Sequence, residues 1–148
     1  MARCYFDTSA VAKLVRVEAY SADVARWAHD PGVTPISSLL TETELRRTVT
    51  RWGIAQEHAT STLAHFELYG VPDWEFKAAG LLETSELRSL DALHVAAAIR
   101  VEADAIITYD ERMIEAAVAV GLSAIQPGVD GRDEIRLIAV DGTASEIG

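Results

Sequence analysis

The chain has little of several residue types that mark common protein classes. Its 148 residues include one cysteine, Cys4, so disulfide scaffolds and cysteine-based zinc sites are excluded. Cys4 lies in the first apolar run, where we expect a buried thiol that packs as a small hydrophobe. No stretch approaches the ~20 apolar residues of a membrane span, and the N-terminus lacks the apolar segment of a signal peptide. We therefore expect a cytoplasmic protein with no membrane association.

Positive charge is also scarce. Thirteen Lys and Arg residues stand against 23 Asp and Glu residues, which gives a net charge of −10. This charge argues against broad electrostatic attraction to nucleic acid or anionic lipid. If the protein handles a polyanion, a metal ion and local arginines must attract it.

Short apolar runs alternate with helical patterns along the chain, and 49% of the residues are hydrophobic, enough for one core. The alternation predicts an α/β fold, a three-layer sandwich with a central, mostly parallel sheet flanked by helices. Strands are expected at residues 3–6, 33–36, 105–109 and 122–125, and helices at 8–17, 22–28, from the Ser37-Ser38 pair to Gly53, and at 56–69, 74–82, 89–101 and 111–120.

The composition changes after Pro127-Gly128, so we predict a domain over residues 1–128 and a C-terminal extension over 129–148. Within the extension, Ile135 to Val140 is either an added edge strand or part of a loose tail.

Three aspartates, Asp7, Asp91 and Asp110, each lie where an apolar run gives way to a helical pattern. In an open α/β sheet, functional groups gather outside the carboxyl ends of the strands, so these acids can converge. One glutamate of the pair Glu42 and Glu44 could join them.

Unit charges ~4 Å apart repel by ~4 kcal/mol at an effective dielectric constant near 20, so a bare cluster of carboxylates favours a bound cation. Oxygen ligands without cysteine select Mg²⁺ or Mn²⁺, which can activate water for attack on a phosphodiester. The hydroxyls of Thr8, Ser9 and Thr108 stand beside the acids and are candidates to orient the carboxylates.

Simpler interpretations exist for each acid. Asp7 and Asp110 could be N-caps, and Asp91, one turn inside its helix, could be a carboxylate favoured by the helix dipole. The recurrence of the pattern together with the neighbouring hydroxyls favours a shared site.

Four segments together, in their order and spacing, resemble the PIN-domain ribonucleases, and in particular the VapC-type toxins of bacterial toxin-antitoxin pairs. The match spans about residues 1–128. The segments are Asp7-Thr8-Ser9-Ala10, Ser37-Ser38 followed by Glu44-Leu45-Arg46-Arg47, Arg88 through His94, and Ile107 through Met113.

The resemblance implies a PIN-like fold and an endoribonuclease that depends on Mg²⁺ or Mn²⁺ and cleaves RNA by metal-activated water. It also implies a cognate antitoxin, with the chain forming a homodimer or a toxin-antitoxin hetero-oligomer. Carried over by position, the acidic quartet that binds metal and catalyses cleavage is Asp7, Glu44, Asp91 and Asp110.

Glu42 is the rival of Glu44. On a helical wheel Glu42 lies nearer the apolar seam, where a carboxylate would be costly, and the family's Glu-aliphatic-Arg pattern selects Glu44. Arg47 and Arg51 follow Glu44 at i+3 and i+7 and are candidates to bind substrate phosphates, although a Glu44-Arg47 surface pair is an alternative. For His94, three residues after Asp91, we expect a supporting or packing role rather than metal ligation.

Competing functions remain. A Mg²⁺-dependent phosphatase or receiver domain also places aspartates at strand ends, but those classes use a lysine late in the chain, and the only lysines are Lys13 and Lys77. A PIN-fold nuclease in RNA processing or acting on DNA, without a toxin role, is a second alternative. A silent binding module with capping acids is a third.

Overall fold

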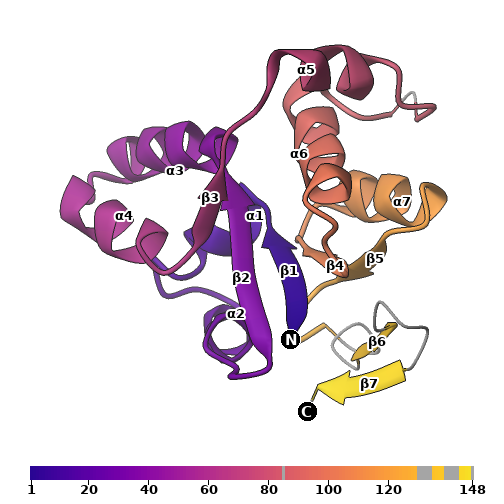
Figure 1. Cartoon of the computed structure of the whole chain (residues 1–148). Coiled ribbons are helices and arrows are strands. Elements are labelled where there is room, and N and C mark those ends of the chain that lie inside the picture. The colour runs from indigo at the N-terminus through magenta and orange to yellow at the C-terminus, as the bar shows by residue number, and fades with distance from the viewer. Residues whose placement is uncertain (85, 130–134, 139–143, 148) are drawn as a thin grey trace.

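The computed structural model describes residues 1–84, 86–129, 135–138 and 144–147. Its centre is a five-stranded sheet whose neighbouring strands all run parallel, in the order β3-β2-β1-β4-β5 (Figure 1). The prediction of a mostly parallel sheet is confirmed. The strands are β1 (Ala2–Phe6), β2 (Val33–Ser38), β3 (Glu67–Tyr69), β4 (Ala105–Ile107) and β5 (Ser123–Ile125).

Seven helices flank this sheet in the described part of the chain. Successive residues of a strand point to opposite faces of the sheet. On one face, Cys4 and Phe6 of β1 join a core cluster with residues of the first four helices. On the other face, Tyr5 joins a second cluster with residues of the last two helices. The predicted three-layer sandwich is therefore confirmed. The helices are α1 (Thr8–Ala12), α2 (Ser21–Ala28), α3 (Leu39–Trp52), α4 (Gln56–Leu63), α5 (Asp73–Gly80), α6 (Ser89–Arg100) and α7 (Glu111–Ala119).

Cys4 is fully buried, as expected, and burial raises the pKa of its thiol to about 12. The side chain therefore stays protonated and acts as a small apolar group. None of the helices in the described ranges is both long and apolar enough to cross a lipid bilayer.

The first helix is shorter than predicted. α1 ends at Ala12 rather than Val17, and the chain continues in turns whose backbone amides donate to carbonyls three residues earlier. Lys13 and Arg16 both donate to the Glu18 carboxylate at 3.2 Å, and these ion pairs hold the bend that leads into α2. The apolar periodicity continues past Ala12, but the helix does not.

The predicted helix over residues 56–69 is wrong after Leu63. α4 ends at Leu63, and Glu67–Tyr69 forms the edge strand β3, which pairs with β2. Phe66 is buried against Phe6, edge to face at 5.1 Å between ring centroids. Packing on the sheet thus overrides a local pattern that favours a helix.

The C-terminal strands β6 (Ile135–Ile138) and β7 (Ala144–Ile147) pair with each other, antiparallel, in a sheet separate from the central one. Residues 139 and 140 of the predicted 135–140 segment lie outside the described residues. The domain boundary at residue 128 stays a prediction.

Candidate functional site

The order of the strands identifies a candidate site at the carboxyl edge of the sheet, around Asp7 and Thr108, which we call the crevice. The chain adds β2 and β3 on one side of β1 and β4 and β5 on the other, so β1 and β4 flank the point where the order reverses. Ligands of open α/β sheets bind at such a point. Asp7 directly follows β1, and Thr108 directly follows β4.

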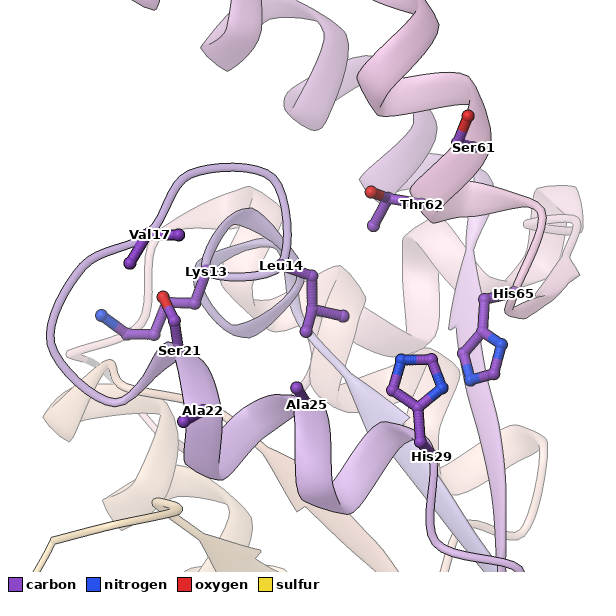
Figure 2. A pocket seen from close by; sticks show the side chains of 10 residues that line it. All are labelled: Lys13, Leu14, Val17, Ser21, Ala22, Ala25, His29, Ser61, Thr62 and His65. Atoms are coloured by element: carbon purple, nitrogen blue, oxygen red, sulfur yellow. The ribbon is translucent and has the colours of Figure 1, made fainter.

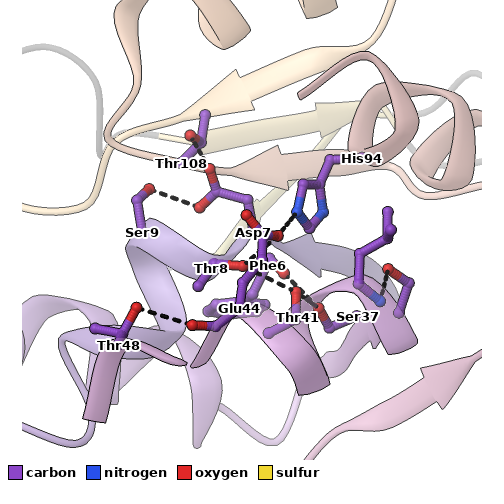
Figure 3. A network of polar contacts seen from close by, with 12 residues as sticks. Phe6, Asp7, Thr8, Ser9, Ser37, Thr41, Glu44, Thr48, His94 and Thr108 are labelled. Atoms are coloured by element: carbon purple, nitrogen blue, oxygen red, sulfur yellow. Dashed lines mark hydrogen bonds and ion pairs between the residues drawn. The ribbon is translucent and has the colours of Figure 1, made fainter. Parts of the chain in front are cut away.

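Asp7 is held by hydrogen bonds on both carboxylate oxygens (Figure 3). Its Oδ1 accepts from Ser9 Oγ at 2.7 Å and from the Ala10 amide at 3.0 Å, and its Oδ2 accepts from Thr108 Oγ1 at 2.6 Å. Only 3% of the residue is exposed, and this burial raises the pKa of Asp7 against the opposing effect of His94 and the three donors. Asp7 caps α1, so the capping interpretation is confirmed, while its role in a shared site stays a prediction.

Asp110 is joined to Asp7 through Thr108. The Asp110 amide donates to Thr108 Oγ1 at 3.1 Å, while its own Oδ1 caps α7 by accepting from the amides of Arg112 and Met113 at 2.9 and 3.4 Å. One hydroxyl therefore links two of the predicted acids. The predicted capping role of Asp110 is also confirmed.

Asp91 reaches the same region from the first turn of α6. It is half-buried, and its pKa is raised first by burial and next by the charge of Asp110, with Asp7 and Glu44 adding to the effect and His94 opposing it. The interaction between two charges weakens with their separation and is screened by salt, so only nearby charges shift a pKa strongly. Asp91 thus lies near enough to the other three acids for their charges to act on it.

Glu44 enters from α3. Its Oε1 accepts from Thr8 Oγ1 at 2.9 Å and from His94 Nε2 at 2.5 Å (Figure 3). Burial alone would raise the pKa of Glu44, but His94 and Thr8 outweigh it, and the pKa is lowered. Glu42 instead pairs with Arg46 at 3.1 Å, so Glu44 is the one of the two that contacts the residue next to Asp7.

The two candidate phosphate-binding arginines are exposed on α3. Arg51 donates to Thr48 Oγ1 at 3.2 Å. Within the described residues Arg47 and Glu44 form no ion pair, so the alternative of a Glu44-Arg47 surface pair is wrong. Binding of substrate by Arg47 and Arg51 stays a prediction.

A buried polar layer beneath the acids was not predicted. Ser37 Oγ donates to the Phe6 carbonyl at 2.7 Å and lies 2.8 Å from Thr41 Oγ1. Tyr5 Oη lies 2.8 Å from both Ser38 Oγ and His94 Nδ1. In the sequence, only Tyr5 indicates such a layer, because a buried phenol inside an apolar strand needs a hydrogen-bond partner.

Known proteins share this architecture. A model of the PIN domain family matches residues 4–119 of the chain. The chain belongs to the PIN-domain family.

Ribonuclease VapC35 of Mycobacterium tuberculosis is 35% identical over 132 residues, which cover 84% of this chain and 96% of that protein. Ribonuclease VapC46 of the same species is 34% identical over 129 residues, covering 86% and 99%. This PIN-domain protein is thus a member of the VapC-type group.

Solved structures agree on the fold. Mycobacterium tuberculosis VapC20, described as a toxin that cleaves the sarcin-ricin loop, has a TM-score of 0.66 at 17% identity, covering 84% of this chain and 99% of that one. A toxin-antitoxin complex from Klebsiella pneumoniae has a TM-score of 0.65 at 18% identity, covering 84% and 97%. At this identity the likeness concerns the fold alone.

The donor set of this PIN domain suits a hard cation. Four carboxylates with no cysteine are the oxygen ligands that Mg²⁺ and Mn²⁺ prefer. Among the described residues, no three or more Asp, Glu, His or Cys side chains stand close enough together to hold an ion by themselves. Mg²⁺ sites commonly use one or two carboxylates and complete the shell with water and substrate phosphate, so this spacing is compatible with such a site. The metal stays a prediction.

A separate cavity of about 530 Å³ lies between the end of α1, α2 and α4 (Figure 2). Two imidazoles, of His29 and His65, face each other at one end with ring centroids 4.3 Å apart, and Lys13 lies at the other end. None of the four acids lines this cavity. The cavity and the acidic crevice are therefore distinct features.

Proposed function

We propose that this PIN-domain protein is an endoribonuclease dependent on Mg²⁺ or Mn²⁺ and the toxin of a toxin-antitoxin pair. The observation that carries the proposal is a set of hydrogen bonds at the point where the strand order reverses: Thr108 joins Asp7 to Asp110, and Glu44 bonds to Thr8, the residue next to Asp7. Membership of the VapC-type group supports the same activity.

Asp7, Glu44, Asp91 and Asp110 would hold the ion together with water and substrate phosphate, some of them directly and the others through a bound water. When bound, it would polarise water and the scissile phosphate and offset the charge of the transition state. Hydrolysis would leave a 5′-phosphate and a 3′-hydroxyl.

The protein residues set the geometry of this site. Ser9, Ala10 and Thr108 hold Asp7 so that its carboxylate cannot rotate away from the crevice. Thr8 holds Glu44 in the same manner. Since these donors are in place before substrate binds, little rearrangement is needed when an ion and a phosphate arrive. Thr8, Ser9 and Thr108 would in this way orient the acids toward an ion.

The test is RNA cleavage by purified protein carrying Asp7→Asn, Glu44→Gln or Asp91→Asn. We expect each variant to lose Mg²⁺-dependent cleavage by at least about 100-fold while remaining folded. Glu42→Gln is the matched control for Glu44→Gln, because Glu42 lies on the same helix and pairs with Arg46 outside the crevice. Cleavage that survives all three substitutions, or that is insensitive to a chelator, would refute the proposal.

The substrate is proposed to be a particular RNA shape or accessible loop. The net charge of −10 disfavours general attraction to polyanions, so selection must come from local fit. An RNA substrate also places the activity in the cytoplasm. Cleavage of unrelated single-stranded RNAs at equal rates would argue against this selectivity.

The antitoxin is proposed as a small protein whose tail covers the crevice. VapBC2 from Rickettsia felis and the Klebsiella pneumoniae complex contain toxin and antitoxin together. An arginine of such a tail could pair with the clustered carboxylates. Expression of this chain should arrest growth, and co-expression with the product of an adjacent small open reading frame should relieve the arrest and give a co-purifying hetero-oligomer. Cleavage without growth arrest would instead favour a processing nuclease.

A further inference from the structure

A continuous chain of hydrogen bonds runs from the end of β2 to the crevice. Ser38 Oγ lies 2.8 Å from Tyr5 Oη, which lies 2.8 Å from His94 Nδ1, and His94 Nε2 lies 2.5 Å from Glu44 Oε1. The four residues come from β2, β1, α6 and α3. The chain thus ties the Glu44 carboxylate to the centre of the fold.

This hydrogen-bonded chain is shielded from water. Tyr5 and Ser38 are fully buried, and His94 is 1% exposed. The Tyr5 and His94 rings meet edge to face, 5.8 Å apart. Buried polar groups are costly unless they are paired, and here both imidazole nitrogens have partners. The His94 ring therefore has a fixed position and orientation.

The chemistry of the partners gives the chain a direction. An ionised Glu44 carboxylate can only accept, so the hydrogen between it and His94 belongs to Nε2. In the neutral ring, Nδ1 then accepts from the Tyr5 hydroxyl, which can accept from Ser38 in turn. Tyr5 consequently favours the tautomer that His94 needs to donate to Glu44.

We infer that His94 is a positioning residue, which holds the Glu44 carboxylate in the crevice and is itself held by Tyr5 and Ser38. This role rests on the proposed function, because it gives Glu44 a place at the metal site. His94 is not a ligand in this arrangement, since both of its nitrogens are engaged with protein atoms. Simple packing does not require those two polar contacts.

Two substitutions of His94 distinguish its contact with Tyr5 from its contact with Glu44. In His94→Gln the side-chain amide nitrogen can occupy the place of Nε2 and still donate to Glu44. In His94→Asn the shorter amide can meet Tyr5 but cannot reach Glu44. We expect His94→Asn to weaken Mn²⁺ binding, measured by calorimetry or by the spectrum of free Mn²⁺, by about 10-fold or more, and His94→Gln to recover most of the loss.

A double-mutant cycle tests whether His94 acts through Glu44. In the Glu44→Gln background, His94→Asn should have no further effect on Mn²⁺ affinity, because the carboxylate that it positions is already gone. An equal loss in both backgrounds, or wild-type affinity in folded His94→Asn, would overturn the inference. If Glu44→Gln alone leaves Mn²⁺ affinity unchanged, the failure lies in the proposed metal site instead.

A further measurement uses the metal-free protein and depends neither on activity nor on whether the His94 variants fold. Nitrogen-15 spectra of the wild-type protein should show His94 with its hydrogen on Nε2, in slow exchange with water. Tyr5→Phe keeps the ring volume and removes only the hydroxyl, so it should alter this signal. A His94 ring with its only hydrogen on Nδ1, or one unaffected by Tyr5→Phe, would refute the directed chain.

Discussion

Thr108 donates a hydrogen bond of 2.6 Å from its Oγ1 to Oδ2 of Asp7, a residue 101 positions earlier in the chain. The same hydroxyl oxygen accepts from the Asp110 amide. Thr108 is fully buried, so neither partner can replace it with water. A single side chain therefore links the ends of β1 and β4, in addition to their backbone pairing.

Substitution of Thr108 by valine, which has the same shape, should destabilise the protein by about 1–3 kcal/mol, because a buried carboxylate and a backbone amide each lose a partner. Urea unfolding monitored by circular dichroism measures the change. Thr108→Ser, which keeps the hydroxyl, is the control and should lose less. Equal midpoints for the valine and serine variants would show that the hydroxyl contributes nothing.

The buried carboxylates are expected to affect stability in opposite directions when no metal is present. Burial raises the pKa of Asp7, so its charge opposes folding, whereas His94 and Thr8 outweigh burial at Glu44 and its lowered pKa means that its charge favours folding. Asp7→Asn should therefore raise the melting temperature of the metal-free protein, and Glu44→Gln should lower it. Each kcal/mol corresponds to about 2–4 °C in a chain of this size. Shifts of the same sign would contradict these pKa directions.

The effect of Asp7→Asn should depend on pH. Because the folded pKa of Asp7 exceeds the ordinary value of about 3.9, the folded state binds more protons there than the unfolded chain does, and the associated stability is lost as the pH rises through the folded pKa. The advantage of Asp7→Asn over the wild type should therefore be largest at neutral pH and vanish below about pH 3.9. Melting curves across this range, with chelator present, provide the measurement. If the stability advantage of Asp7→Asn instead increased as the pH fell, the folded pKa of Asp7 would be lowered rather than raised.

A second buried charge lies away from the crevice. Glu75 on α5 is fully buried and pairs with Arg100 on α6, whose Nη2 also donates to the Gly70 carbonyl at 2.6 Å. The other Glu75 oxygen, Oε2, has no hydrogen-bond partner within the described residues. The ion pair thus fastens α5 to α6 while one oxygen remains unsatisfied.

Arg100→Ala should lower the free energy of unfolding by about 3–5 kcal/mol, since it leaves the Glu75 charge buried without its partner. The double variant Glu75→Leu with Arg100→Met should recover most of this loss, because no buried charge remains. Urea unfolding of the single and double variants checks both statements. A double variant no more stable than Arg100→Ala would show that the charge is not the cause.

Much of the architecture could be predicted from periodicity and junction residues. β1, β2 and the helix that ends at Gly53 follow from local patterns, and Gly53 adopts a positive φ of 67° where an L side chain would be strained. β3 could not be predicted in this way, because its strand conformation depends on pairing with β2 and on the burial of Phe66 against Phe6.

The candidate site shows a similar division. The acids and their adjacent hydroxyls are visible in sequence because they sit at strand ends, where the fold class fixes their neighbourhood. The contact of His94 with Tyr5 is not visible, since 89 positions separate the two residues and only the packing of α6 against β1 joins them. Whether the four acids bind metal stays a prediction.

The central position of β1 also determines when the crevice can exist during synthesis. β1 leaves the ribosome first, but its neighbour β4 follows about a hundred residues later, as the 101-position separation of Asp7 and Thr108 illustrates. Pairings this distant close late in folding. A nascent chain that ends before β4 already carries Asp7, Glu44 and Asp91, yet lacks the strand that fixes Asp7 in place. Completion of the site is thus coupled to the synthesis of β4, and fragments that end before β4 would be unable to assemble it.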